Sequence, residues 1–151
     1  LHDLKPKLSN LCHSLSEYGL SETLVQPDCN DNNMLVSQEV ITLIDLGEIS
    51  ISHPFFSIIN FLYVIKKHHK LREEGRTYQK IKSAAFSNYR DFFNNKNDLE
   101  SAIQISIQLH LVYWILGSHR LMKACGKEKL KAANHWSFKD KLLELLREFP
   151  N

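Results

Sequence analysis

Cysteine is scarce in this sequence and follows no pattern. Cys12, Cys29 and Cys125 form an odd, widely spaced set without a C-x-x-C pair. This excludes a disulfide framework and a zinc ribbon as the basis of the fold. Reduced thiols are typical of the cytosol, so we expect a cytoplasmic protein.

A long apolar run is also missing. The longest one, Phe55 to Ile65, has 11 residues and includes Ser57 and Asn60. A membrane span needs roughly 20 apolar residues. The run therefore predicts a core helix, and we expect no membrane partner.

Basic residues are scarce in the first 60 positions. These positions hold two Lys or Arg against eight Asp or Glu, a net charge of −6, whereas residues 61–151 hold 17 against 9, a net charge of +8. The acidic part is suited to holding a cation, and most of the basic residues are expected on solvated helix faces. Nucleic-acid binding is not favoured, since no known module contains the lysines concerned, which are Lys127, Lys129, Lys131, Lys139 and Lys141.

The residues present indicate one folded domain of mixed class. Apolar residues make up 43% of the chain and charged residues 24%, as in globular domains. Leucines at helical spacing predict a first helix from Leu4 to Tyr18, with Gly19 as its stop. A strand over 23–25, a polar loop over 26–33, a hairpin of 34–36 with 40–44, a loop over 47–53 and helices over 54–71, 77–93, 98–123 and 137–147 follow. We therefore predict an α+β fold, mostly α, with a small β-hairpin unit on a helical bundle.

Three of these helices carry particular expectations. Isoleucines alternate like a strand in 103–107, but the length of the stretch and its lack of turn residues favour a helix. Ser137 is expected to cap the last helix. His68 and His69 are expected to complement the dipole at the end of their helix.

The hairpin places oxygen ligands together. If it turns at Glu39, Asn33 pairs with Asp45, and their Cα atoms lie about 5 Å apart. An amide oxygen and a carboxylate at this distance are suited to one hard cation such as Mg²⁺. Asp28 lies five residues before Asn33 on the same loop. In kinases such an Asp orients the substrate hydroxyl, while the Asn and the second Asp hold Mg²⁺ on ATP.

The segments around these residues resemble the aminoglycoside phosphotransferase and choline kinase family. The family loop H-G-D-x-x-x-x-N-[IV]-L corresponds to QPDCNDNNML at residues 26–35, and its metal motif I-D-[WF]-[GE] to IDLG at residues 44–47. The resemblance implies a protein-kinase-like C-terminal lobe in which Asp28 is catalytic and Asn33 and Asp45 bind Mg²⁺ and the phosphates of ATP. It implies phosphorylation of a hydroxyl of a small molecule. Gln26, Pro27, His53 and Ser57 stand where the family has His, Gly, Asp and Asp.

The resemblance also bears on domain organisation. Family members carry a β-rich nucleotide lobe before this loop, and no such lobe precedes Leu1. We therefore expect residues 1–151 to be a single domain, the C-terminal lobe of a longer kinase-like protein. Alone it should transfer phosphate poorly, because positioning is most of this catalysis. The alternative is a degenerate lobe that serves as a binding or regulatory module without turnover.

A calcium loop is the other interpretation of the polar segment. The EF-hand spacing fits Asp28, Asn30, Asn32 and Glu39, with Asn33 in place of the usual glycine. An EF-hand needs a helix on both sides of its loop. Pro27 and the strand-like residues 40–44 argue against those helices.

Overall fold

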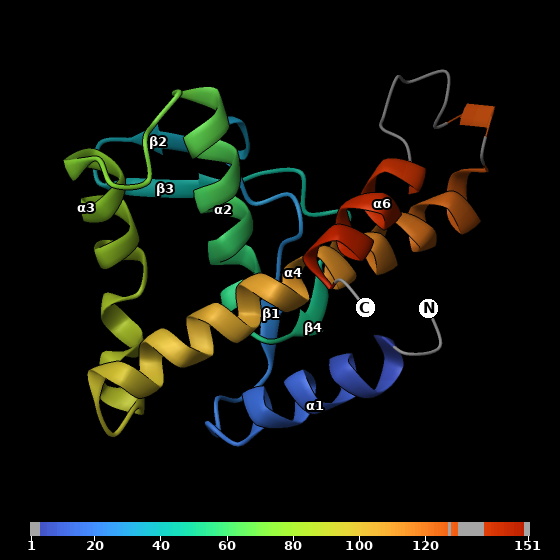
Figure 1. Ribbon diagram of the computed structural model, residues 1–151. Helices are drawn as coiled ribbons and strands as arrows, with labels where there is room; N and C mark the ends of the chain where they lie inside the picture. The colour runs from blue at the N-terminus through green and yellow to red at the C-terminus, as the bar shows by residue number, and fades with distance from the viewer. Residues whose placement is uncertain (1–3, 127, 130–137, 150–151) are drawn as a thin grey trace.

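The computed structural model describes residues 4–126, 128–129 and 138–149. One long helix, α4, runs through the molecule, and other helices pack along it (Figure 1). In chain order they are α1 (Leu4–Ser16), β1 (Thr23–Val25), the 3-10 helix η1 (Asp31–Asn33), β2 (Met34–Ser37), β3 (Val40–Leu43), β4 (Ser50–Ser52), α2 (Phe55–His68), α3 (Arg76–Ala85), the 3-10 helix η2 (Ser87–Phe92), α4 (Lys96–Cys125) and α6 (Phe138–Glu148). The predicted α+β class, mostly α, is confirmed.

Helix α4 is the centre of the packing. It contacts α1, α2 and α6, which lie along its length (Figure 1). Asn95 caps its first turn by accepting the N–H of Asp98 at 3.0 Å. The predicted helix is therefore confirmed over the alternating isoleucines, where Ile103 is buried and Ile107 is exposed.

By length and composition, α4 is also long and apolar enough to cross a membrane, the one such helix in the described part of the chain. Its buried residues include Leu99, Ala102 and Ile103, which belong to the hydrophobic core. A core helix of a soluble protein passes the same test, so the finding is weak support for a membrane span.

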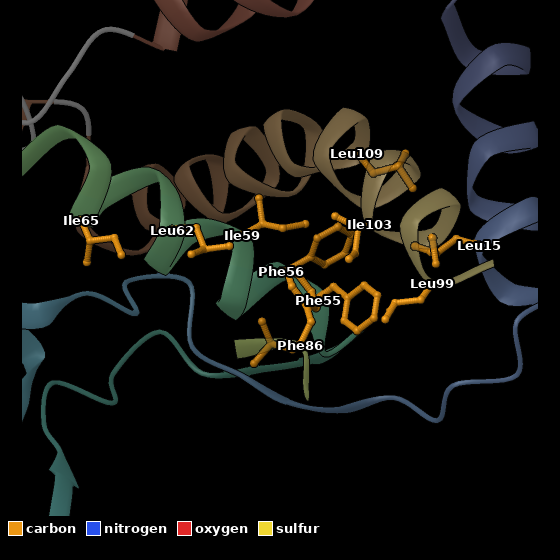
Figure 2. Packing of buried hydrophobic residues seen from close by; sticks show 12 residues of the cluster. Leu15, Phe55, Phe56, Ile59, Leu62, Ile65, Phe86, Leu99, Ile103 and Leu109 are labelled. Carbon is orange, nitrogen blue, oxygen red and sulfur yellow. The ribbon is translucent and has the colours of Figure 1, made fainter. Parts of the chain in front are cut away.

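The core forms where α2 crosses α4. Figure 2 shows Phe56 of α2 beside Ile103 of α4. Phe55 has no exposed surface. Its ring meets the rings of Phe86 at 4.9 Å and Tyr89 at 5.1 Å edge to face. These rings fix the start of α2, which carries residues that contact the predicted catalytic loop.

The strands form two separate two-stranded antiparallel sheets. One is the predicted hairpin, β2 with β3. The other pairs β1 with β4, placing Leu24 opposite Ile51. The sequence predicted β1 but assigned β4 to a loop. This second sheet brings the end of β1, where the polar loop begins, close to the start of α2.

The helical half differs from expectation in one place. The helix predicted over 77–93 is α3 followed by the 3-10 helix η2, because the α-helix ends at Ala85. Phe86 is buried and turns the chain between the two segments. The predicted cap, Ser137, lies outside the described residues.

Candidate functional site

The loop between β1 and η1 joins two of the three predicted site residues directly. The side-chain amide of Asn33 donates to Oδ2 of Asp28 at 2.8 Å and to its backbone carbonyl at 2.9 Å. The amide of Asn30 donates to Oδ1 of Asp28 at 2.8 Å and to the same carbonyl at 3.0 Å. Two neutral donors therefore fix the orientation of the Asp28 carboxylate, which is exposed to solvent.

This arrangement also orients the amide of Asn33. Its nitrogen is used by Asp28, so its oxygen is the atom available for a ligand, and Oδ1 accepts no hydrogen bond from any described residue. By contrast, Oδ1 of Asn30 accepts the N–H of Asn32 at 2.9 Å and caps η1. Of the two described amides that bind the Asp28 carboxylate, that of Asn33 therefore presents the unused oxygen, as a metal ligand would.

The predicted register of the hairpin is wrong by one residue. Met34 pairs with Leu43 and Ser37 with Val40, so the two-residue turn is Gln38–Glu39. Asn33 consequently lies opposite Ile44, whose N–H donates to its carbonyl at 3.0 Å. Asp45 is one position further along the chain. A slip of one residue turns successive side chains to opposite faces, so direct pairing of Asn33 with Asp45 is lost.

A left-handed backbone at Asp45 redirects the chain after this offset. Its φ is +56°, a conformation that Asp tolerates better than most residues. The side-chain amide of Gln26 donates to the Asp45 carbonyl. Asp45 is thereby tied to the residue two positions before Asp28, while its carboxylate stays exposed. No hydrogen bond joins that carboxylate to Asp28 or Asn33.

Two polar residues of α2 form hydrogen bonds with the backbone of the loop between β1 and η1. The hydroxyl of Ser57 accepts the backbone N–H of Gln26 at 2.9 Å, and the amide of Asn60 donates to the Cys29 carbonyl at 3.1 Å. Asn60 is only 1% exposed, so this contact is sheltered from water. The sequence signal for this role was the presence of both residues, three positions apart, within the longest apolar run. From the sequence this run was expected only as a core helix, without a role for these two side chains in holding the loop.

His53 opens α2 from a partly buried position. Its Nδ1 accepts the N–H of Phe55 at 3.3 Å, and its ring meets the Phe55 ring edge to face at 4.9 Å. Burial lowers the pKa of His53 to about 4, so the ring is neutral at pH 7. His53 therefore helps start the helix and supplies no charge where the resembling family has an Asp.

His68 and His69 have a role that sequence analysis did not find. Nδ1 of His68 lies 3.0 Å from Oδ1 of Asp31, and Nε2 of His69 lies 2.7 Å from Oδ2. These hydrogen bonds, first that of His69 and then that of His68, lower the pKa of Asp31. The two histidines thus fasten η1, which ends at Asn33, to the end of α2. We call this contact the Asp31 clasp.

The remaining chemistry of the loop is limited. Burial, and then the charge of Asp28, raise the pKa of the Cys29 thiol, so this cysteine is a poor nucleophile at neutral pH. Among the described residues no group of three His, Cys, Asp or Glu is placed to hold a metal ion. The loop leads through η1 into strand β2, which excludes the two helices of an EF-hand.

Comparison with models of known families, with curated proteins and with solved structures gives no match to this chain.

Proposed function

We propose that this chain is the catalytic-loop lobe of an ATP- and Mg²⁺-dependent phosphotransferase that phosphorylates a hydroxyl of a small molecule. The observation that carries the proposal is the hydrogen bond of the Asn33 amide to both the carbonyl and the carboxylate of Asp28. It joins Asp28, proposed as the general base, to Asn33, proposed as an amide oxygen ligand, five residues apart. That is the arrangement of a kinase catalytic loop.

The donor set fits magnesium bound together with a nucleotide. Asn33 offers an amide oxygen and Asp45 a carboxylate, both hard ligands. Mg²⁺ is usually held by one or two carboxylates plus substrate phosphates, so one carboxylate is enough in the presence of ATP and too few for the metal alone. When bound, Mg²⁺ neutralises charge on the phosphates.

The protein's own residues have distinct roles in this proposal. Asp28 accepts or orients the proton of the substrate hydroxyl, with its carboxylate held in place by Asn30 and Asn33. Ser57 and Asn60 keep the loop in place from α2. The parent protein supplies the nucleotide lobe and acts in the cytoplasm, without nucleic acid or membrane as partner. The substrate is a small molecule with a hydroxyl group.

A degenerate lobe with a binding or regulatory role is the second candidate. Both carboxylate oxygens of Asp28 already accept hydrogen bonds from amides, and Gln26 binds the Asp45 carbonyl. Because these polar groups already bind one another, the site is stable without a substrate. This candidate predicts a folded protein that binds no Mg-ATP.

Titration calorimetry of Mg-ATP on the full-length parent protein tests both candidates. Asp45→Asn is the informative variant, because Asn also tolerates a positive φ and the change removes only the charge. Asp91→Asn, at an exposed position in η2, is the matched control. We expect Mg²⁺-dependent binding in the wild type and the control, and its loss in Asp45→Asn.

A second variant separates binding from turnover. Asp28→Asn removes the base but keeps the metal ligands, so Mg-ATP should still bind while phosphate transfer to hydroxyl compounds falls by about 10²-fold or more. A folded wild-type parent that binds no Mg-ATP overturns the enzyme proposal and leaves the degenerate lobe.

A further inference from the structure

The hairpin β2–β3 exposes apolar side chains on both of its faces. Leu35 is 54% exposed and Val36 is 72% exposed, and neighbours in a strand point to opposite faces. Val36 lies opposite Ile41, which is 65% exposed. A two-stranded hairpin with both faces in water is at best marginally stable. Another surface is therefore needed to cover it.

The edges of this hairpin are also unprotected. Each strand pairs only with the other, so each has one open edge. Residues 32–44 contain a single charged residue, Glu39 at the turn, and no Lys or Pro. Proteins usually place Lys or Pro on exposed edge strands to prevent association. Their absence here favours association through this hairpin.

The charge around the hairpin defines the kind of surface it fits. Residues 26–53 contain five Asp or Glu and no Lys or Arg. Packing this hairpin against the same hairpin of another copy would bring like charges together. A complementary surface must instead combine apolar groups with Lys or Arg.

The chain itself presents such a surface at the C-terminal end of α2 and in the residues that follow it. A hollow of about 610 Å³ is lined by Tyr63, Lys66, Lys67, Lys70, Leu71, Glu73 and Glu74. Glu73 pairs with Lys66, whereas Lys67 and Lys70 form no ion pair with any residue that the structure describes. Tyr63 and Leu71 supply apolar surface, and Glu74 is the one further acid in the lining.

The hairpin and the lysine-lined hollow lie at the same end of the molecule. The Asp31 clasp places the end of α2 beside η1, from which β2 starts. Figure 1 shows β2, β3 and the end of α2 together, away from both termini. Two complementary surfaces at one end allow a closed two-fold contact, in which each copy uses its hairpin and its hollow once.

We propose that the β2–β3 hairpin of one copy docks into the lysine-lined hollow of a second copy, and reciprocally, to form a two-fold symmetric dimer. Val36 and Ile41 pack near Tyr63 and Leu71 of the second copy. Glu39 at the turn faces its Lys67 and Lys70. The argument for this dimer does not use the proposed phosphotransfer activity, but the hairpin lies between the proposed Mg²⁺ ligands Asn33 and Asp45.

Sedimentation-velocity ultracentrifugation of the 151-residue chain over a range of concentrations tests the proposal. We expect a reversible monomer–dimer equilibrium. Val36→Lys and Ile41→Lys should each raise the dissociation constant about tenfold per contact, and so about a hundredfold for a dimer with two contacts. Leu116→Lys is the matched control, because Leu116 is 59% exposed but lies on α4. All variants should keep the helical circular dichroism of the wild type.

A charge reversal locates the second surface. Glu39→Lys alone, or Lys67→Glu with Lys70→Glu, should weaken the dimer, and the combination of all three changes should restore it. A monomer at every concentration overturns the proposal. So does association that continues beyond a dimer, equal weakening by Leu116→Lys, or failure of the combined reversal to restore the dimer.

Discussion

Acid should destabilise this protein through His110, a buried histidine of α4. The residue is 6% exposed, and no described atom hydrogen-bonds to its Nε2. Its ring stacks on Trp114 at 5.6 Å. Burial, and then the charge of Lys141, lower the pKa of His110 from 6.5 to about 4. The folded state therefore holds this ring neutral, while the unfolded chain protonates it below pH 6.5.

The size and sign of the effect follow from proton linkage. Between pH 6.5 and 4 the unfolded state binds up to one proton more, so the free energy of unfolding falls by about 1.4 kcal/mol per pH unit as the pH is lowered. The full loss is about 3 kcal/mol for a pKa near 4. The contribution of His110 is complete above pH 6.5 and lost below pH 4. His53, whose pKa is lowered in the same way, adds to the loss in the same window.

Urea unfolding followed by circular dichroism at pH 7.5, 5.5 and 4.5 measures this dependence. His110→Leu should remove about half or more of the acid destabilisation, because it removes the most buried titrating ring. His119→Gln is the matched control, since His119 is an exposed histidine of the same helix. The pH dependence, rather than the stability at one pH, is the readout. An unchanged pH dependence in His110→Leu would refute the assignment of the effect to burial of this ring.

Three further predictions concern the core and the loop. Phe55→Ala should lower the free energy of unfolding, measured by urea titration, by about 3–5 kcal/mol, because Phe55 has no exposed surface. Phe92→Ala is the control: Phe92 is 66% exposed, so the change should be less than about 1 kcal/mol. Asn60→Ala should cost about 1–3 kcal/mol, because the Cys29 carbonyl loses its partner; no loss in urea titration would contradict this. Asp31→Asn should cost at most about 1 kcal/mol at pH 7, since the clasp is partly exposed to solvent, but should speed amide hydrogen exchange in η1. Exchange in η1 equal to that of the wild type would show that the clasp does not order the loop.

The elements that the sequence predicted are those with local signals. α1 ends near Gly19, which has a positive φ of 71°, and α2 coincides with the longest apolar run. The helix α4 was identified by its length despite alternating isoleucines. β4 has no such signal, because it has three residues and forms only by pairing with β1, which lies 27 positions earlier.

The sequence indicated the local contact of the candidate site, between Asp28 and Asn33, and missed its long-range contacts. Asp28 and Asn33 are five residues apart on one loop, so their proximity follows from the chain. The hairpin register depends on a two-residue turn with Gln38 at a positive φ of 54°. No Asn-Gly or Asp-Gly pair marks that turn in the sequence, which is why the expected register was off by one. The Asp31 clasp joins residues 37 and 38 positions apart, beyond the reach of a sequence pattern.

At two positions where this chain differs from the resembling family, the side chain still supports the loop. Ser57 stands where the resembling family has an Asp, yet its hydroxyl still accepts a backbone N–H of the loop. A neutral hydroxyl is sufficient for that contact, because a backbone N–H needs only an acceptor. Gln26 likewise binds the carbonyl of Asp45 through an amide in place of an imidazole. The conformation of the loop therefore does not depend on the family's charged supports. The proposed activity depends instead on Asp28, Asn33 and Asp45, so variants at those three positions distinguish a phosphotransferase from a scaffold.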